Sequence, residues 1–507
     1  MKKLLVAMTT VALILTGGVA GQAQNAWSPS ISDIAGATGN LGPEQIRGFH
    51  NLLIQEATGG KASFGSFRTG SWQVRQTAEN YKACFDPGPY GDCDTGKSGM
   101  YVGSAVLPVC GEVVESCIEK VWVYPQEGVA TEATFVKNLE GQTTKGYPAR
   151  GIPTGSTPSI WSSGTLHSGG TGEYVVMANM FFNLQGSRMY VDKLQLSVTP
   201  VKEVSAPGET APVYTVCNGG AQRGGTTVGD CLSAGNGLSF ECTYTQKDIC
   251  GLTQEFSDNT RIGVSLKLHN KITGWFHGRV KAPDLQVSRV SDIYNRVKID
   301  ALPVQVSRFV AKSRPDLGDK NPMDVIQNIG FAGPYTDVSA TSPDAFRVLQ
   351  NYRQRANDTA AGVSTIWSLS SVSADQASNS GSQCLADTSR VLGLVTTNAT
   401  AYSGSTPQFR GGFLNYEVAG THYLPGGVEL SQGSYDLVMR SDVARCLYGF
   451  ANAPISASVS VVNNKGQKSF ATTVVNEKNG WLKMAAYGFT FSKKVIKVKI
   501  TKAKKKR

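Results

Sequence analysis

Alternating apolar and polar residues, in many short runs, are the feature that most limits how this chain can fold. Apolar residues, including one alanine, occupy every second position from Ile262 to Leu268 and again from Ile455 to Val461. A period of two places successive side chains on opposite faces of a β-strand. The stretch from Tyr174 to Phe182 is more continuously apolar, as expected of a strand that is buried on both faces. We therefore expect a mainly β protein.

The composition agrees with this expectation and excludes two other classes of protein. Of 507 residues, 40% are hydrophobic and only 17% are charged, which excludes a coiled coil and a wholly disordered chain. Glycine is frequent, with 56 residues, and stretches rich in glycine, proline, serine and threonine separate the expected strands. Many short strands between such turns favour a β-sandwich or a jelly roll.

The order of the segments predicts several domains. We expect a β-sandwich or jelly-roll-like part with disulfides at residues 25–311, short helices and a linker at 312–383, and an immunoglobulin-like sandwich at 384–501. An Asn-Gly pair at 479–480, between two strand-like runs, predicts a hairpin inside the last unit. Residues 502–507 would form a basic tail.

Three segments carry helical patterns. Apolar residues recur at helical spacing between Pro43 and Ala57, and glycines follow as a stop signal. A second short helix is expected from Pro322 to Ile329, and a third begins at Pro343 with Ser342 as its cap. Seven serines then lie in the fifteen residues 368–382, a composition typical of a linker.

The N-terminus has the three-part layout of a secretory signal peptide. Lys2 and Lys3 precede an uncharged apolar stretch, and small residues follow it. Cleavage after Ala20 or Ala23 would suit the small-residue preference of the cleavage site, and we expect residues 1–23 to be removed. A membrane anchor is the alternative, but the apolar stretch is shorter than the roughly 20 residues of a membrane-spanning helix. The mature protein is therefore expected outside the cell or at its surface.

The cysteines agree with export. Their number is even, and eight of the ten lie close to a neighbour. In an exported chain this pattern predicts disulfides, and nearest-neighbour pairing closes the shortest loops at the least cost in entropy. Spacing alone leaves other pairings open. Zinc is disfavoured because no short Cys-x-x-Cys spacing occurs and histidine is scarce. The preferred pairs are Cys84–Cys93, Cys110–Cys117, Cys217–Cys231, Cys242–Cys250 and Cys384–Cys446.

The positive charge lies at the two ends of the chain. The formal net charge is +11, and nine Lys or Arg residues without an acid lie at 493–507. Together with the two N-terminal lysines they account for the whole net charge, which argues against a nucleic-acid-binding body. Alternating apolar residues at 495–500 predict a strand, whose lysines would guard a sheet edge. The solvated tail would contact an anionic envelope polymer or a glycan through Lys502, Lys504, Lys505, Lys506 and Arg507.

The C-terminal module resembles a known group of proteins. The segments 441–450 (SDVARCLYGF), 480–483 (GWLK) and 487–491 (YGFTF) are similar to those of uncharacterised secreted actinobacterial proteins. The resemblance covers roughly 120 residues at the end of the chain. It implies an exported, envelope-associated protein and brings no catalytic residues.

The chain carries none of the common sequence motifs for catalysis. The serine hydrolase, zinc protease and phosphate-binding loop patterns do not occur. His269 and His277 lie eight residues apart, and each is expected to be a satisfied or exposed histidine rather than a ligand. Glu112, Glu115 and Glu119 would share a helical face, which could act as an acid/base set but is more simply a solvated face. Aromatic residues that could stack on sugars, but are more simply core, are Trp161, Trp275 and Phe276.

One short segment has the residue types of a calcium loop. Asp86, Asp92 and Asp94 lie within eleven residues that also contain Gly96. Carboxylate oxygens are the ligands that Ca²⁺ prefers. The distal glutamate of an EF-hand loop is missing, and Asp and Gly are also common turn residues. We therefore expect no cofactor, with calcium as the one alternative.

These observations favour a structural or adhesive protein of the cell envelope that is not an enzyme. A secreted carbohydrate-active enzyme with a C-terminal binding module is the alternative, because the carboxylates of a glycosidase are placed by the fold and leave no sequence motif. The ligand and the oligomeric state stay open.

Overall fold

The computed structural model describes most of the chain from residue 100 onward and one short segment before it. The described residues are 50–55, 100–112, 114–140, 153–185, 188–205, 242–272, 274–313, 317–319, 325, 335–372, 377, 380–387, 389–450, 455–463, 468–469, 471–491 and 494–502.

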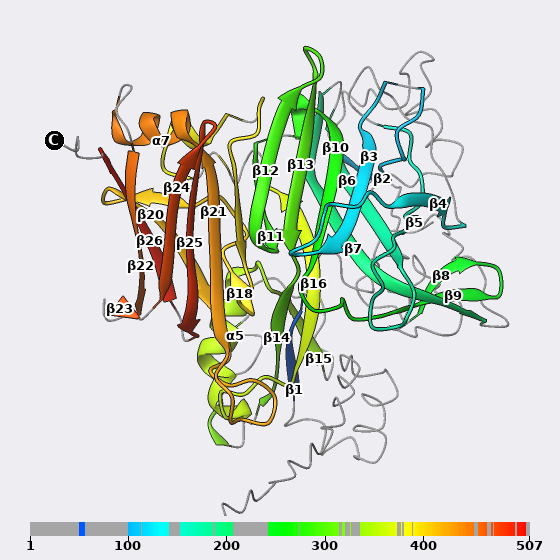
Figure 1. Ribbon diagram of the computed structural model, residues 1–507. Coiled ribbons are helices and arrows are strands. Elements are labelled where there is room, and N and C mark those ends of the chain that lie inside the picture. The colour runs from blue at the N-terminus through cyan, green and yellow to red at the C-terminus, as the bar shows by residue number, and fades with distance from the viewer. Residues whose placement is uncertain are drawn as a thin grey trace, which may run out of the picture.

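A sheet of sixteen strands forms the middle of the molecule (Figure 1). Its strands come from the expected N-terminal, middle and C-terminal parts of the chain alike. Along the main path they are β24 (Thr472–Lys478), β25 (Trp481–Thr490), β21 (Gln432–Arg440), β17 (Gly393–Thr397), β11 (Trp275–Arg279), β16 (Gly362–Ser371), β7 (Arg188–Ser205), β6 (Glu173–Gln185), β5 (Ser159–Ser162) and β4 (Thr134–Asn138). Beside this path lie β1 (His50–Gln55), β2 (Met100–Val106), β8 (Cys242–Gln246), β9 (Ile249–Thr253), β14 (Val304–Ser313) and β15 (Tyr335–Ser339).

Two smaller sheets pack against this main sheet. The four-stranded sheet is, in order, β12 (Lys281–Arg289), β13 (Tyr294–Leu302), β10 (Thr260–His269) and β3 (Cys117–Pro125). The six-stranded sheet has the order β18 (Ala401–Tyr402), β20 (Phe413–Ala419), β26 (Lys494–Lys502), β22 (Ile455–Asn463) and β23 (Lys468–Ser469), with β19 (Gln408–Arg410) paired to β20. The six-stranded sheet lies at the left of Figure 1 and the four-stranded sheet near the centre.

The two smaller sheets cover opposite faces of the main sheet. On β17, Leu394 belongs to the core that contains Val297 of the four-stranded sheet. The next residue, Val395, belongs to the core that contains Ile496 of the six-stranded sheet. Successive side chains of a strand point to opposite faces, so the main sheet is the middle of three layers here.

In the described part of the chain, two α-helices lie between strands. Helix α5 (Pro343–Tyr352) begins where predicted, and the Ser342 side chain accepts a hydrogen bond of 3.1 Å from the amide of Asp344. Helix α7 (Ser441–Tyr448) ends at Gly449, whose φ of 64° is left-handed. Within the described residues, no helix is both long enough and apolar enough to cross a membrane.

The mainly β prediction is confirmed, and so are its individual strands. The alternating runs form β10 and β22, and the continuous apolar run forms part of β6, where Tyr174, Val175 and Val176 are all 0% exposed. The predicted hairpin joins β24 to β25. Its turn residues Asn479 and Gly480 have φ of 51° and 77°, as a tight two-residue turn requires.

Two elements were predicted wrongly. The segment expected to be a helix between Pro43 and Ala57 contains strand β1, which pairs with β14 on one side and β15 on the other. The serine-rich segment expected to be a linker begins inside β16, a strand between β11 and β7 near the middle of the main sheet. Ser368, Ser370 and Ser371 are 1%, 3% and 5% exposed, so serine here is a small buried residue.

The predicted strand at 495–500 exists as β26, but it is not an edge strand. It lies between β20 and β22 in the six-stranded sheet. Lys502, assigned to a solvated tail, is its last residue and lies opposite Ile455 of β22. Residues 504–507 of the expected tail are outside the described residues.

Two predicted disulfides are present. Cys110 is bonded to Cys117, and Cys384 is bonded to Cys446. The latter joins the segment before β17 to helix α7. The described part of the chain contains no free cysteine. The other three predicted pairs involve side chains that lie outside the described residues.

Candidate binding face

Strand β26 presents lysines on the outer side of the six-stranded sheet. Ile496, Val498 and Ile500 are 0%, 0% and 1% exposed and belong to the core beneath the sheet. Because side chains alternate along a strand, Lys497 and Lys499 lie on the opposite, outer face. Lys499 is exposed and Lys497 is half-buried. The period of two that builds the core therefore also gathers positive charge outside it.

An aromatic ring lies beside these two lysines. The ammonium groups of Lys497 and Lys499 are 5.9 Å and 5.6 Å from the centre of the Phe413 ring on β20. An aromatic ring attracts a cation through the negative charge of its face. Arg410 of β19 lies directly opposite Phe413, so its side chain emerges on the same face. The ring therefore has cationic neighbours from two strands.

Uncharged polar residues fill much of the remaining face. Ser458 and Ser460 of β22 lie opposite Lys499 and Lys497. Asn415 of β20 lies opposite Lys497 on the other side. The hydroxyl and amide groups offer hydrogen bonds without adding charge.

The balance of charge on this outer face is positive. Lys468 of β23 is exposed and lies opposite Val462, which has the same strand parity as the two serines. Glu417 is the acidic residue of β20 on this side. We call the outer surface formed by Arg410, Phe413, Lys468, Lys497 and Lys499 the cationic sheet face.

The lysine that begins β26 is not part of the cationic sheet face. Lys494 is only 6% exposed and has the strand parity of the inward-facing residues. Burial lowers its pKa, and the positive charge of Arg353 adds to this effect. Burying an ammonium group is costly, so its place in the core is a structural feature and does not contribute to an outer binding surface.

A second polar cluster lies between the main and four-stranded sheets. The carboxyl group of Asp436 on β21 is 5% exposed. It accepts a hydrogen bond from the Tyr487 hydroxyl and one of 3.2 Å from the amide of Ala282. Burial raises its pKa to about 6, against the opposing effect of these hydrogen bonds and of Lys281 and Lys483. Asp436 is therefore a proton-binding group in the contact between two layers.

Asp284 of β12 lies near the same contact, and its pKa shifts in the opposite direction. Its carboxylate forms an ion pair of 2.5 Å with Lys483 of β25. Burial alone would raise the pKa of Asp284, but the hydrogen bonds from Lys483 and Gln286 lower it overall. The pair links the edge of the four-stranded sheet to the main sheet.

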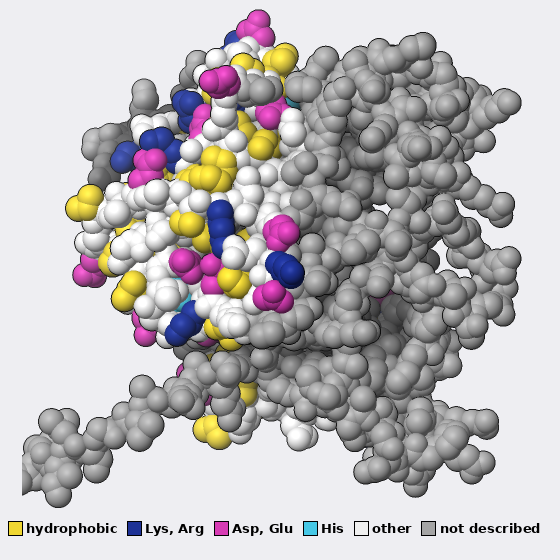
Figure 2. Space-filling view, turned by 90° about the vertical axis from the view of Figure 1, so that its right-hand side faces the viewer, with side chains coloured by type: hydrophobic (Ala, Val, Ile, Leu, Met, Phe, Trp, Pro, Cys, Tyr) yellow, Lys and Arg dark blue, Asp and Glu magenta, His cyan; other side chains and the backbone are white. Residues whose placement is uncertain are grey.

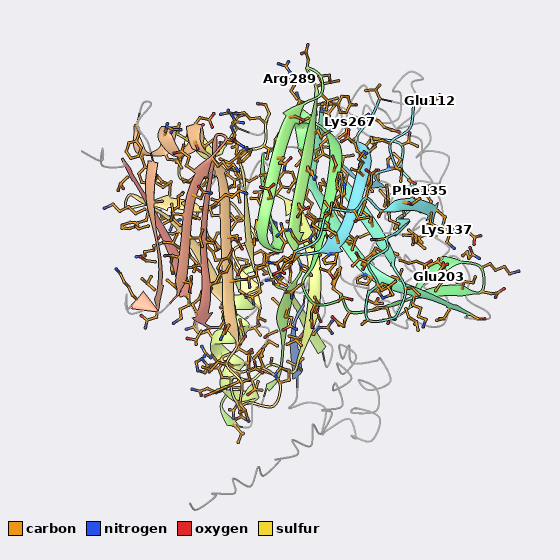
Figure 3. All side chains as sticks on the ribbon, viewed as in Figure 1. Glu112, Phe135, Lys137, Glu203, Lys267 and Arg289 are labelled. Atoms are coloured by element: carbon orange, nitrogen blue, oxygen red, sulfur yellow. A yellow bond between two sulfur atoms is a disulfide. The ribbon has the colours of Figure 1, made fainter. Side chains whose placement is uncertain are left out.

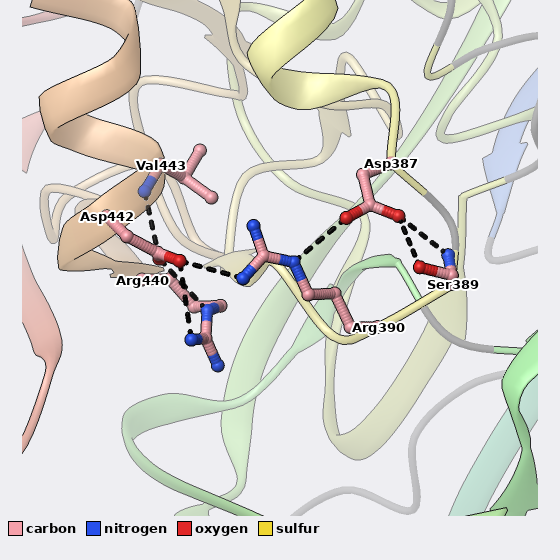
Figure 4. A network of polar contacts seen from close by, with 6 residues as sticks. All are labelled: Asp387, Ser389, Arg390, Arg440, Asp442 and Val443. Carbon is pink, nitrogen blue, oxygen red and sulfur yellow. Dashed lines mark hydrogen bonds and ion pairs between the residues drawn. The ribbon is translucent and has the colours of Figure 1, made fainter. Parts of the chain in front are cut away.

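A third polar cluster, shown in Figure 4, fastens helix α7 to its surroundings. Arg390 donates to Asp387 at 2.8 Å and to Asp442 at 2.7 Å, and Arg440 donates to Asp442 at 3.0 Å. Burial opposes ionisation of Asp442, but the two arginines lower its pKa to about 2. Every polar group drawn has a partner within the chain, so this cluster is a structural fastening beside the Cys384–Cys446 bond.

The helical face expected for Glu112, Glu115 and Glu119 does not form. Glu119 lies in strand β3 rather than on a helix, and both guanidinium arms of Arg296 bind it at 2.6 Å and 2.8 Å. Glu115 is 6% exposed, whereas Glu112 is exposed. A helical face was expected because the three residues are spaced by three and four. Glu112 and Glu115 instead lie within the short loop that the Cys110–Cys117 bond closes, and the pairing of β3 with β10 holds Glu119 in an extended strand.

The histidines and aromatic residues considered for binding belong to the interior. His269 and His277 are both 6% exposed, and desolvation lowers the pKa of His277 to about 3. Trp161, Trp275 and Phe276 are 4%, 1% and 2% exposed, so they are core residues. The calcium residues Asp86, Asp92 and Asp94 lie outside the described residues. Among the described residues, no group of three or more potential metal ligands occurs.

Sequence reasoning found the lysines of β26 but missed their neighbours. Arg410, Phe413 and Lys468 are distant in sequence, and only strand pairing brings them to one face. The alternation at 413–419 was a usable signal, because it predicts which side chains of β20 share a face. It could not indicate which strands lie beside β20.

The comparisons with known proteins give no relative. No protein family matches the sequence, and no curated protein is similar to it. The likeness of the C-terminal segment to secreted actinobacterial proteins thus stays a prediction.

Proposed function

We propose that this protein is an exported component of the cell envelope that binds an anionic envelope polymer through the cationic sheet face. The observation that carries the proposal is the placement of Lys497, Lys499 and Arg410 around the Phe413 ring on one exposed side of a sheet. The signal-like N-terminus and the two disulfides support export.

The shape of the face suits a linear polyanion. Alternate residues of a strand are separated by about 6.6 Å, and neighbouring strands by about 4.8 Å. Lys497 and Lys499 are alternate residues of β26, and the other cations come from strands beyond its neighbours. A polymer with a charge on every repeat can therefore meet several cations at once without a deep pocket. Because the groups are exposed, the attraction should weaken as salt is added.

The basic C-terminus would extend this surface. Strand β26 ends at Lys502, and four further Lys or Arg residues follow at 504–507. Attachment to an anionic polymer would then involve two parts, a fixed sheet face and the residues beyond it. Their contributions are separable by mutation.

The test is binding to a soluble phosphodiester polymer and to polygalacturonate, with neutral dextran as the uncharged probe. The double variant Lys497→Ser, Lys499→Ser removes two positive charges from the face. The matched control, Lys247→Ser with Lys478→Ser, removes the same charge from two exposed positions elsewhere. A third variant is truncated after Lys502 and so lacks residues 503–507.

We expect the double variant to bind at least tenfold more weakly at 0.05 M salt, and the control to bind within twofold of the unmodified protein. Affinity of the unmodified protein should fall as the salt concentration rises to 0.15 M. Equal losses in the double variant and in the control would show that net charge alone matters, and would overturn the assignment of this face.

The alternative function, a carbohydrate-active enzyme, has one observation in its favour. Asp436 and Asp284 both contact the same layer junction, and their pKa values shift in opposite directions. Such a separation suits a general acid and an ionised carboxylate. Asp436, however, is held between two sheets by Tyr487 and Ala282. Release of reducing sugar by the unmodified protein, abolished in Asp436→Asn, would establish this alternative.

A further inference from the structure

The four-stranded sheet has an outer face of a different kind from the cationic sheet face. On β10, Ile262, Val264 and Leu266 are at most 1% exposed and pack toward the main sheet. The residues between them, Gly263 and Ser265, therefore belong to the outer side. Lys267 follows on the same side and is labelled in Figure 3.

A half-buried tryptophan lies on this outer face, next to a glycine. Trp122 of β3 lies directly opposite Gly263. A Cβ atom at residue 263 would come within 3.2 Å of the indole carbon Cε3 and within 3.0 Å of Asp300 Oδ2. The absence of a side chain at Gly263 thus lets the indole lie close against β10.

A lysine contacts the indole ring from the neighbouring strand. The ammonium group of Lys298 on β13 is 4.0 Å from the centre of the Trp122 ring. Ser265 lies opposite Lys298 on β10, and Gln286 lies opposite it on β12. The ammonium group therefore contacts the ring, and a hydroxyl and an amide group lie beside Lys298 on its two neighbouring strands.

The carboxylates of this face are already bound. Asp300 accepts hydrogen bonds of 2.6 Å from both Arg261 and Tyr124. Burial raises the pKa of Tyr124 to about 12, and the hydrogen bond and negative charge of Asp300 add to this effect.

The second carboxylate, Glu119, accepts two hydrogen bonds from Arg296, at 2.6 Å and 2.8 Å, and one from Ser265 at 2.8 Å. Lys267 and Lys298 have no carboxylate within ion-pair distance in the described part of the chain. Two cations on this face are thus available to an outside anion.

We propose that this face is a second binding site, for a sugar that carries an acidic group. The sugar's C–H face would lie on the Trp122 ring, and its carboxylate or phosphate would take Lys298 away from the ring. Lys267 lies two residues along from Ser265 and would receive the next acidic group of a chain. This site is independent of the cationic sheet face, because the two sheets cover opposite faces of the main sheet.

The surroundings of Trp122 favour a saccharide over a nucleic acid. A nucleic acid presents a continuous phosphodiester backbone and prefers a track of positive charge beside the stacking ring. Here Asp300 and Glu119 occupy Arg261 and Arg296, so the face offers no continuous track of available positive charge. A sugar ring has an apolar face and a polar rim, which matches a single aromatic ring set among hydrogen-bonding groups.

The test uses oligogalacturonate as the acidic sugar chain, in the variant that already carries Lys497→Ser and Lys499→Ser. This background keeps the result separate from the proposed function. Trp122→Ala removes the stacking ring, and Lys298→Met keeps the length of the side chain while removing its charge. Lys247→Met serves as the matched control. Circular dichroism and thermal unfolding check that each variant is folded.

Isothermal titration should show at least tenfold weaker binding in Trp122→Ala and in Lys298→Met, and no more than twofold change in the control. A neutral glucose oligomer should bind more weakly than oligogalacturonate. If Trp122→Ala does not fold, Lys298→Met alone decides. The proposal is overturned if oligogalacturonate fails to bind the background protein, or if Lys298→Met binds as tightly as that background. It is also overturned if an oligodeoxynucleotide or polyglutamate binds tighter than the sugar.

Discussion

The hydroxyl group of Tyr487 donates a hydrogen bond to the buried carboxyl group of Asp436 on the neighbouring strand. Ala282 of the four-stranded sheet donates to the same carboxyl group. Asp436 therefore links β21 and β25 of the main sheet to the edge of the four-stranded sheet. Because its carboxyl group binds a proton, this contact depends on pH.

Asp436 should make stability fall as the pH rises. Its folded-state pKa is raised by burial to about 6, from an ordinary value of 3.8. The protonated form is thus favoured by folding, and its contribution is complete below pH 3.8 and lost as the pH rises through 6. In Asp436→Asn this dependence should disappear.

The free energy of unfolding, measured by denaturant titration from pH 4 to pH 7, gives the comparison. Relative to Asp436→Asn, the free energy of unfolding of the unmodified protein should fall by up to about 3 kcal/mol between pH 4 and pH 7. The exposed residue Asp292 provides the control substitution to Asn. A difference that stays constant with pH would show that Asp436 is ionised in the folded protein throughout.

The Cys384–Cys446 disulfide should contribute more stability than Cys110–Cys117. The two bonds close loops with sequence separations of 62 and 7 residues. The chain-entropy model gives about 4 kcal/mol for the longer loop and about 2 kcal/mol for the shorter. Paired Cys→Ser variants, compared by thermal unfolding, test this order. Peptide mapping that finds Cys384 or Cys446 joined to another cysteine would contradict the pairing itself.

Replacing Gly480 by alanine should destabilise the β24–β25 hairpin. A Cβ atom at residue 480 meets nothing within 4 Å, so the cost comes from its φ of 77°. We expect a loss of about 1 kcal/mol. Gly362 is the matched control, since a Cβ there also meets nothing within 4 Å and its φ is not left-handed. Equal effects of Gly480→Ala and Gly362→Ala on the unfolding free energy would refute the turn argument.

The sequence predicted best those strands that bury one face in a core and present the other face to an outer surface. Ile262 to Leu268 and Ile496 to Ile500 alternate because their two faces meet different environments, a core and an outer surface. The same alternation located Lys497 and Lys499. It could not place Arg410 or Trp122 beside their neighbours, because those contacts depend on which strands pair.

Strands enclosed by other strands were the ones that the sequence did not reveal. β1 lies between β14 and β15, and its residues fitted a helical spacing by chance. β16 contains serine at positions where β11 and β7 lie on either side. In both strands, pairing with neighbouring strands satisfies the backbone hydrogen bonds, although local residue propensity does not favour a strand there. The start of the serine-rich segment is part of β16 and so lies within the main sheet.

Two adjacent serines of β16 should respond to mutation in opposite ways. The Ser371 hydroxyl accepts a hydrogen bond of 2.7 Å from the buried amide of Leu194 on β7. The Ser370 hydroxyl, on the other face of the strand, is buried and has no hydrogen-bond partner among the residues that the structure describes. Ser371→Ala would leave a buried amide unpaired, which costs about 1–3 kcal/mol. Ser370→Ala removes a hydroxyl that gains nothing from burial, so the unfolding free energy should stay the same or rise by up to about 1 kcal/mol.

The pair is a matched comparison, because both substitutions remove one hydroxyl from side chains that are 5% and 3% exposed. Urea titrations of the two variants at pH 7 give the free energies. Similar losses in both would mean that the serines act only through their size and β-propensity. A loss confined to Ser371→Ala would show that a residue whose composition suggests a linker is fixed in the middle of the sheet by a specific hydrogen bond.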